Sequence, residues 1–502
     1  MCGIYFAYGA FDSADTAKAC ELAARGPDKA HYEYINNYEN GLNIYIAFFR
    51  LAINGLGASG DQPIRIGKYT LICNGEIYNH KFLNAMLCAS LTTTSDCEII
   101  LHGYIKYGVS FFGQLEGEFA FIIYDGETVV ACRDTYGVRP LFYFLDNQKL
   151  ILSSELKGND YRALQFPPGH YMIYDISSNK SNKATKIFKK FIPLFTIHRW
   201  PLGRPWPRHA LTVAIEKRLM SDREIGCLLS GGLDSSLVAA ITAEHMPGIR
   251  TFSIGMEGSP DLHYANLVAA HIKSIHTSIV LTAEDFIAAI PATIKAIESY
   301  DVTTVRASVG NYLVGQWIAR NTECKVILCG DFADEVCGGY KYFQRAPNPE
   351  EFDAECRRLV GDIHYFDGLR ADRCLAAHGL EVRVPFSDPD FVETYWAFPA
   401  ADRMPTINKL EKKLLRDDFT GTGLLPDEVL WRPKEAFSDG VSATDKSWYL
   451  IAREHAATQK KTEEEYYKTI FRSFYGDAVA APYKWMPKWS PETTDPSART
   501  II

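Results

Sequence analysis

Residues 230–236 form a short polar turn of sequence SGGLDSS. The preceding residues 225–229 make an apolar run of strand length, and residues 237–241 resemble the buried side of a helix. Two glycines let the backbone approach a ligand, and free N–H groups at a helix N-terminus attract phosphate oxygens. The serines add hydroxyl donors, and Asp234 can supply a carboxylate to Mg²⁺. The turn therefore predicts a pyrophosphate-binding loop, and the alternative is a loop that only caps a helix.

The second residue of the chain, Cys2, is a candidate nucleophile. Removal of Met1, which a small second residue permits, would leave the thiol beside its own α-amine. That amine has an ordinary pKa of about 8, so it can accept the thiol proton without help from a histidine. The alternative is an arbitrary start residue whose thiol is simply buried.

Polar residues in apolar surroundings add to this candidate site. Arg50 lies in an apolar, strand-like segment, and its planar guanidinium suits a substrate carboxylate. Asn74 can offer a side-chain amide and Gly75 a backbone N–H, which together would form an oxyanion hole. Asp96 provides a carboxylate before a helix. The simpler alternatives are an Asx turn at Asn74 and a helix N-cap at Ser95 or Asp96.

Two further strands and one turn could complete a nucleotide site. The strand at 249–255 should border an adenosine pocket, because ligands of open α/β sheets bind at the carboxyl ends of strands. The strand at 326–329 runs into an acidic segment, where Asp334 could share Mg²⁺ with Asp234 or cap the next helix. Lys434 lies in a turn and could neutralise leaving pyrophosphate or be a surface cation.

The elements that must position these residues change character along the chain. Strand-like runs separated by turn residues predict antiparallel hairpins in the first part, at 117–124, 129–132, 141–144, 150–153 and 170–174. Strands alternating with longer helical runs predict a parallel α/β sheet in the second part. We therefore predict two domains, at 1–190 and 208–502, joined by a linker at 191–207.

The composition limits the possible partners and the cellular compartment. The 502 residues carry a net charge of -8, which gives no electrostatic footprint for nucleic acid. The sequence has no basic leader and no apolar run of membrane-spanning length, so we expect a cytoplasmic protein without a membrane partner. None of the twelve cysteines forms a CxxC pair, and several lie in apolar runs. Buried thiols fit this pattern better than disulfides or a zinc site.

The first-half motifs, including residues 25–28 and 74–79, resemble the class II glutamine amidotransferase domain. The resemblance implies a four-layer αββα N-terminal-nucleophile hydrolase fold. Cys2 would attack the glutamine amide, Asn74 and Gly75 would stabilise the oxyanion, and glutamate and ammonia would be released. Arg50 would hold the α-carboxylate, and Glu76 and Asp96 the α-ammonium. The implied glutamine-binding residues are Arg50, Leu51, Ala52, Ile53, Asn54, Asn74, Gly75, Glu76 and Asp96.

The turn at 230–236 resembles the pyrophosphate loop of the ATP-pyrophosphatase superfamily, and the whole chain resembles the asparagine synthetase family. Segments 298–308, 432–441 and 485–489 support this resemblance. It implies a Rossmann-like parallel α/β domain and a ligase that uses ATP, Mg²⁺, aspartate and glutamine, with β-aspartyl-AMP as intermediate, in a possible homodimer. The implied ATP-binding residues are Leu229, Ser230, Gly231, Gly232, Asp234, Ser235, Ser236, Ile254, Cys329 and Gly330. The implied aspartate and adenylate residues are Thr303, Thr304, Arg306, Asp331 and Lys434, the last two catalytic, and Asp234 and Asp334 would bind the metal.

One segment departs from the family pattern. Most relatives have Ser-Gly-Glu-Gly after the third strand, whereas this chain has Cys329-Gly330-Asp331-Phe332. Asp331 is one methylene shorter than glutamate, and Phe332 is bulky and disfavours the positive φ that glycine permits. Two alternatives therefore stay open. One is a different carboxylate acceptor, as in β-lactam-forming synthetases, and the other is a glutaminase-active relative whose synthetase site is degenerate and regulatory.

Overall fold

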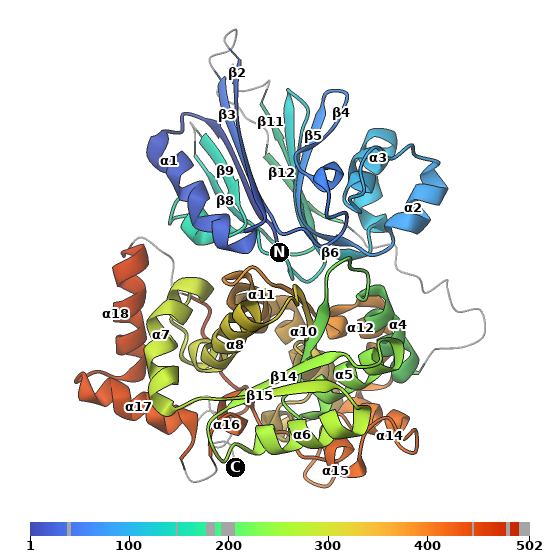
Figure 1. The fold of residues 1–502 in the computed structure, drawn as a ribbon, viewed down its shortest axis with the longest axis vertical. Coiled ribbons are helices and arrows are strands. Elements are labelled where there is room, and N and C mark those ends of the chain that lie inside the picture. The colour runs from blue at the N-terminus through green and yellow to red at the C-terminus, as the bar shows by residue number, and fades with distance from the viewer. Residues whose placement is uncertain are drawn as a thin grey trace.

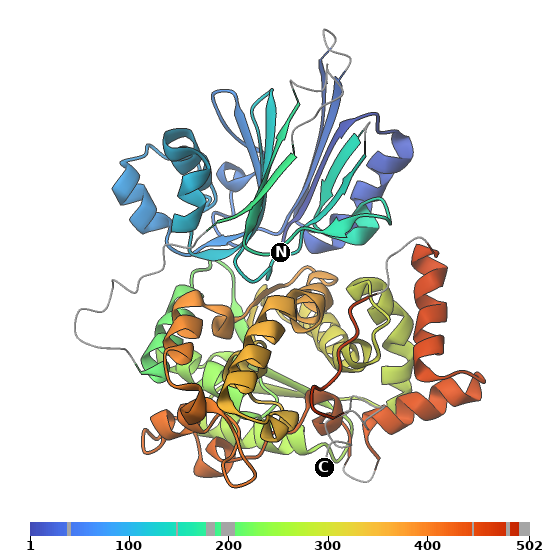
Figure 2. The same ribbon diagram turned by 180° about the vertical axis from the view of Figure 1, so that it is seen from behind.

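The computed structural model describes residues 1–37, 42–146, 149–176, 186–191, 206–443, 446–477 and 482–490. Most of the linker predicted at 191–207 lies outside these residues. Figures 1 and 2 show the N-terminal and C-terminal parts stacked one on the other, with the N-terminus of the chain between them.

The N-terminal domain contains two six-stranded antiparallel sheets that face each other. Their strand orders are β10-β8-β9-β1-β3-β2 and β12-β11-β7-β6-β5-β4. Figure 1 shows α1 outside the first sheet and α2 and α3 outside the second, which confirms the four-layer αββα arrangement. The strands are β1 (Gly3–Gly9), β2 (Lys29–Asn37), β3 (Leu42–Arg50), β4 (Ile64–Ile66), β5 (Tyr69–Ile77), β6 (Gly117–Tyr124), β7 (Thr128–Arg133), β8 (Phe142–Leu145), β9 (Lys149–Ser153), β10 (Leu164–Gln165), β11 (His170–Asp175) and β12 (Lys186–Lys190). The helices are α1 (Ser13–Lys18), α2 (His80–Leu87) and α3 (Glu98–Tyr107).

Alternation along the strands produces these layers. Ile4 and Phe6 of β1 belong to the core between the two sheets, whereas Tyr5 and Ala7 belong to the core beneath the outer helical layer. Successive side chains of a strand point to opposite faces, so apolar residues at both parities bury both faces of β1. Cys2 directly precedes β1, so the packing of both faces of this strand holds Cys2 at its N-terminal end.

The C-terminal domain is built on a five-stranded sheet of order β15-β14-β13-β16-β17, in which every pairing is parallel. Figures 1 and 2 show helices on both sides of it. The strands are β13 (Ile225–Leu228), β14 (Arg250–Gly255), β15 (Ile275–Val280), β16 (Val326–Leu328) and β17 (Glu381–Arg383). The helices are α4 (Pro207–Lys217), α5 (Leu233–His245), α6 (Pro260–Ile272), α7 (Ala283–Ile297), α8 (Val302–Asn321), α9 (Ala333–Cys337), α10 (Pro349–Asp362), α11 (Asp367–Ala376), α12 (Pro389–Trp396), α13 (Ala400–Arg403), α14 (Lys413–Phe419), α15 (Asp427–Leu430), α16 (Phe437–Gly440), α17 (Trp448–Thr458) and α18 (Glu463–Tyr475).

The strand order reverses at β13. The chain adds β14 and β15 on one side of β13 and then places β16 and β17 on the other. Loops that leave the carboxyl ends of β13 and β16 must therefore diverge, and the crevice between them is where open α/β sheets bind ligands. The sheet topology alone thus brings the loop after β13 and the acidic segment after β16 to one place.

Buried charged residues join the two domains. Arg25 of the N-terminal domain contacts Glu155 at 2.5 Å and Asp372 of α11 at 2.7 Å, and all three side chains are almost fully buried. The segment at 153–157 also contacts the C-terminal domain, because the Leu156 N–H donates to Glu298 at 3.0 Å. These pairs fix the position of α11 relative to the N-terminal domain.

The remaining sequence expectations concern cysteines and membranes. All twelve cysteines are unpaired, and Cys73, Cys132, Cys227 and Cys329 are buried as expected. None of the helices in the described ranges combines the length and apolarity needed to span a bilayer.

Arg25→Ala should lower the free energy of unfolding by about 3 kcal/mol, because it removes one partner from each of two buried carboxylates, although Glu155 keeps Lys157 and Asp372 keeps Arg373. The shift in the denaturant midpoint measures the effect. Arg162→Ala is the control, since it removes a largely exposed arginine paired with Asp160, and should leave the midpoint nearly unchanged. Equal shifts in the two variants would show that the domain contact does not depend on Arg25.

Candidate active sites

The predicted pyrophosphate loop lies between β13 and α5. Gly231 has φ 72°, and a Cβ at this position would lie 2.4 Å from the Ala265 nitrogen, so only glycine fits. The hydroxyls of Ser230 and Ser235 lie 3.0 Å apart, and the Ser230 N–H donates to the Ser235 hydroxyl at 3.1 Å. The loop is therefore closed on itself and presents the N-terminus of α5 to the crevice.

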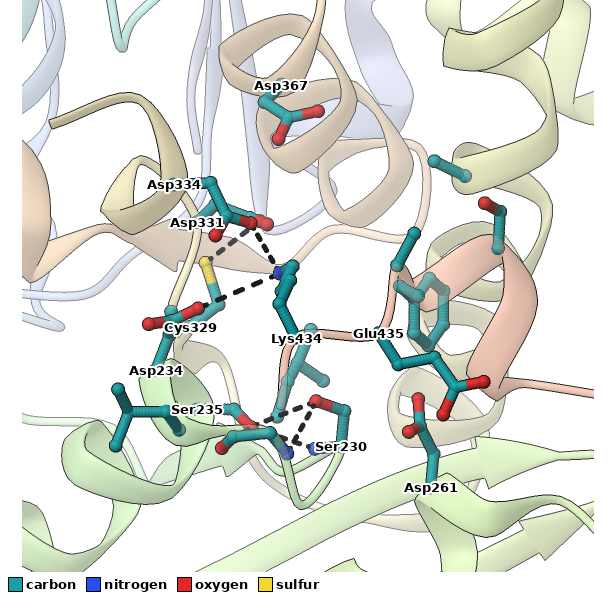
Figure 3. A pocket seen from close by; sticks show the side chains of 18 of the residues that line it. Ser230, Asp234, Ser235, Asp261, Cys329, Asp331, Asp334, Asp367, Lys434 and Glu435 are labelled. Atoms are coloured by element: carbon teal, nitrogen blue, oxygen red, sulfur yellow. Dashed lines mark hydrogen bonds and ion pairs between the residues drawn. The ribbon is translucent and has the colours of Figure 1, made fainter. Parts of the chain in front are cut away.

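A cavity of about 210 Å³ opens at this crevice (Figure 3). Most of the predicted synthetase residues line it, and Gly231 and Ser236 are not among its lining residues. Gly231 shapes the turn instead, and Ser236 is fully buried in the first turns of α5. The predicted residues that line the cavity are Leu229, Ser230, Gly232, Asp234, Ser235, Ile254, Thr303, Thr304, Arg306, Cys329, Gly330, Asp331, Asp334 and Lys434.

Two lysines face the predicted metal carboxylates. Lys412, buried and absent from our sequence prediction, contacts Asp234 at 2.6 Å and Asp334 at 2.5 Å. Lys434 contacts Asp334 at 2.5 Å, as Figure 3 shows. Burial raises the pKa of Asp334, but Lys412 and Lys434 outweigh it and hold that pKa below its usual range. The Asp334 carboxylate is therefore ionised, and the ammonium groups lie where leaving pyrophosphate would need positive charge.

Asp234 and Asp334 offer the donor set that Mg²⁺ prefers, one or two carboxylates supplemented by substrate phosphates and water. The described residues contain no cluster of three or more acidic, histidine or cysteine side chains arranged for a metal ion. The Lys412 ammonium bridges the two carboxylates. A metal ion brought by a nucleotide would have to share these oxygens with Lys412.

The segment at 329–332 after β16, which departs from the family pattern, adopts a definite geometry. Asp331 accepts a hydrogen bond from Arg370 at 2.6 Å and from the Cys329 thiol at 3.2 Å. Phe332 is buried and has φ 76°, the left-handed conformation that we expected it to disfavour. Its ring lies 3.4 Å from where Gly368 would carry a Cβ. The turn therefore keeps a glycine-like backbone, and strain at Phe332 is balanced by close packing of its ring.

The predicted aspartate-binding residues lie at the start of α8. Asp301 caps the helix and accepts from the Thr304 N–H at 2.9 Å and from the Thr304 hydroxyl at 2.7 Å. The buried Thr303 hydroxyl has no hydrogen-bond partner among the described residues. Arg306 forms a buried ion pair with Glu463 at 2.5 Å. The side chain of Arg306 is thus held in place before any ligand binds.

At the N-terminus, Cys2 and the residues of β5 come together. The Cys2 sulfur lies 3.4 Å from the Leu51 nitrogen and 3.6 Å from the Leu51 oxygen. With Met1 attached, burial raises the pKa of the Cys2 thiol to about 11 and lowers that of the Met1 α-amine to about 6. Asn74 is fully buried, and neither its amide oxygen nor its nitrogen has a partner among the described residues. An unpaired buried amide is what a preformed oxyanion hole requires.

The predicted glutamine-binding residues lie in β5, at the end of β3 and in the loop after it, and, for Asp96, just before α3. Arg50 binds a protein carboxylate in this structure, Asp61 at 2.7 Å. Asn54 donates to Glu76, and Asp96 accepts from the Ile77 N–H at 2.6 Å. Burial, followed by the charge of Asp96, raises the pKa of Glu76 well above its usual range. Leu51, Ala52 and Ile53 are buried beneath the loop, and a Cβ on Gly75 would lie 2.3 Å from the Glu118 oxygen.

Several lining residues were not among the site residues predicted from the sequence. Lys412 lies in a charged segment that resembles a surface helix, 178 residues from Asp234. Arg370 and Asp367 meet Asp331 only through the fold, with Arg370 and Asp367 3.0 Å apart. Asp261 forms an ion pair with Arg432 at 2.8 Å on the opposite wall, and burial raises its pKa to about 6. Figure 3 places Asp261 across the cavity from Asp331.

Comparison with known proteins matches both halves of the chain. A family described as "Asparagine synthase" matches residues 207–353 and 344–498, and a "Glutamine amidotransferase domain" matches residues 1–186. Proteins named "Asparagine synthetase [glutamine-hydrolyzing]" from Gallus gallus and Mus musculus are 41% and 42% identical over alignments of 558 and 559 residues, which cover 100% of this chain and 98% of each relative. A solved glutamine phosphoribosylpyrophosphate amidotransferase from B. subtilis aligns at 17% identity with a TM-score of 0.31, over 51% of this chain and 66% of that one.

Lys412→Met should weaken ATP binding at least about tenfold, because it removes a charge that faces the phosphate loop and leaves two carboxylates without their bridge. Isothermal calorimetry measures the change. Lys413→Met is the matched control, since Lys413 is 42% exposed and pairs with Asp417. Equal affinities for Lys412→Met and the unaltered protein would contradict the assignment.

Proposed function

The chain belongs to the family of glutamine-hydrolysing asparagine synthetases, and we propose that it makes asparagine from aspartate, ATP and glutamine with the residues assigned above. The observation that carries this proposal is one cavity that contains the phosphate loop, the acidic segment after β16 and two lysines. The N-terminal domain supplies a separate site around Cys2.

In the N-terminal site, the Cys2 thiolate attacks the side-chain amide carbon of glutamine after Met1 is removed. The freed α-amine takes the thiol proton and returns it to the leaving ammonia. Asn74 and Gly75 donate to the oxyanion of the tetrahedral intermediate, which is consistent with the unpaired amide of Asn74. Water then hydrolyses the thioester to glutamate. Glu76 and Asp96 bind the α-ammonium, and Arg50 exchanges Asp61 for the α-carboxylate.

In the C-terminal site, the β-carboxylate of aspartate attacks the α-phosphorus of ATP, and pyrophosphate leaves toward the loop at 230–236. Lys412 and Lys434 stabilise the charge on the leaving group. Ammonia then attacks the acyl carbon, and AMP leaves as the C–N bond of asparagine forms. Asp331, held by Arg370, accepts the proton that the nitrogen loses. Mg²⁺ held by Asp234 and Asp334 would add positive charge beside the phosphates.

The family relationship also supports proposals about the domain limits, the cellular location and the oligomeric state. We propose domain limits of 1–190 and 208–502, a cytoplasmic location and a homodimer. Ammonia would pass between the sites across the domain interface.

The decisive experiment measures pyrophosphate release with ATP, Mg²⁺, aspartate and ammonium in the absence of glutamine. Release that depends on aspartate supports the proposal. Release driven by a different carboxylate, or no release alongside intact glutaminase activity, would instead support the altered-acceptor or degenerate-site alternative.

Cys2→Ala should abolish glutamine-dependent synthesis and spare the ammonia-dependent reaction, because only the N-terminal site needs the thiol. Asp234→Asn should do the reverse, keeping glutaminase activity while stopping pyrophosphate release. Parallel assays of glutamate and pyrophosphate measure both. Loss of both activities in either variant would contradict the division of labour.

Asp331→Glu combined with Phe332→Gly should raise synthetase turnover if the shorter carboxylate is misplaced, since an error of about 1 Å can cost on the order of a hundredfold in rate. Steady-state pyrophosphate release at saturating aspartate measures kcat. The single Phe332→Gly variant is the control for relief of backbone strain alone. An unchanged or lower kcat in the double variant would mean that the Arg370 contact already places Asp331 correctly.

A further inference from the structure

One arginine of the synthetase domain reaches into the glutamine site. Arg383 ends β17, the strand at one edge of the parallel sheet, and its side chain is fully buried. Its Nε donates to Glu381 at 2.8 Å, and its Nη1 donates to the backbone oxygens of Arg218 at 2.8 Å and Met220 at 2.6 Å. These bonds fix the guanidinium plane at the domain interface.

The remaining nitrogen of this guanidinium faces the N-terminal domain. Arg383 Nη2 makes no hydrogen bond of good geometry among the described residues; it lies 2.8 Å from Glu381 Oε1 in an ion pair and 3.6 Å from Glu76 Oε1. The distance to Glu76 is too long for a hydrogen bond but short for two opposite charges in a buried setting. The buried guanidinium therefore lies between Glu381 and Glu76, the carboxylate assigned to the glutamine ammonium, within ion-pair distance of both.

We propose that Arg383 is a positioning residue for glutamine binding: from the synthetase domain, its positive charge favours the ionised form of the Glu76 carboxylate and orients it toward the ammonium of the substrate. The proposal rests on the function proposed above for the N-terminal site.

The charges around Glu76 support this role. Glu76 is 4% exposed, and burial, Asp96 and Glu381 all raise its pKa, whereas Arg383 and Arg139 lower it. His80 lies near Asp96 and lowers the pKa of that second carboxyl. Glu76 attracts an ammonium only when ionised, so loss of the Arg383 charge must move glutamine binding to higher pH. A shift of one pKa unit changes the ionised fraction about tenfold below the pKa.

The same strand also contacts the second active site. Arg383 pairs in register with Leu328 of β16, and its backbone oxygen accepts the N–H of Cys329 at 3.1 Å. Cys329 lies two residues before Asp331 and donates to it. Substitution of the Arg383 side chain leaves this backbone bond available, so the synthetase site should keep its geometry.

The test compares Arg383→Gln with the unaltered protein. The KM for glutamine in glutaminase assays should rise at least about tenfold with little change in kcat. The profile of kcat/KM for glutamine against pH should move to higher pH. Ammonia-dependent pyrophosphate release should stay unchanged, which also reports that the variant is folded. Arg218→Gln is the matched control, because it removes another buried interface arginine, paired with Glu118 and Asp388, and should leave the KM for glutamine unchanged.

Arg383→Lys keeps the charge and decides the case if Arg383→Gln does not fold. It should raise the KM for glutamine and keep the unaltered pH profile. An unchanged KM in whichever variant is folded overturns the proposal, as does an equal rise in Arg218→Gln. Absence of glutaminase activity in the unaltered protein would instead refute the proposed function of the N-terminal site.

Discussion

The parallel pairing of β13 with β16 is the constraint on which the synthetase site depends. Because the strand order reverses at β13, the loop after it and the segment after β16 leave the sheet at one crevice. Asp234 and Asp334 enter that crevice from the two sides, and Lys412 from a distant part of the chain bridges them. A buried lysine between two carboxylates avoids the cost of isolated buried charges while keeping positive charge next to the phosphate loop. The sheet topology thus brings the two carboxylates together, and the lysine between them offsets the cost of burying them.

The domain interface follows the same physical logic on a larger scale. Arg25, Arg218 and Arg383 are all buried, and each pairs with a carboxylate of the other domain, namely Asp372, Glu118 and Glu76 respectively. Each such pair is expensive to leave incomplete, so the network fixes one relative placement of the domains more strictly than apolar contact would. The side chain of Arg383 faces the glutamine site, and the backbone of the same residue is bonded to the strand that leads to Asp331. One short strand thus supports residues of both sites.

Local motifs could be predicted from the sequence, and long-range partners could not. Cys2, Asn74 and the 230–236 turn carry their chemistry in adjacent residues. The spacing of strand-like and helical runs predicted antiparallel strands in the first part and a parallel sheet in the second. Lys412 lies in a charged segment typical of a solvated helix, and only the fold buries it beside Asp234. The left-handed conformation of Phe332 was the opposite of our expectation, because the strand before it and the helix after it impose the turn. Arg50 was expected to need an anion, but the sequence did not indicate Asp61 as that partner.

The buried position of Met1 has a consequence for the order of events during synthesis. Met1 is 1% exposed, its sulfur lies 2.8 Å from an Arg139 nitrogen, and its core contacts include residues of the C-terminal domain. An exopeptidase needs a free and extended chain end, which the assembled domains do not offer. Removal of Met1, which the proposed glutaminase mechanism requires, therefore has to precede docking of the second domain. Under that mechanism, a chain that folds with Met1 still attached is trapped without its catalytic amine.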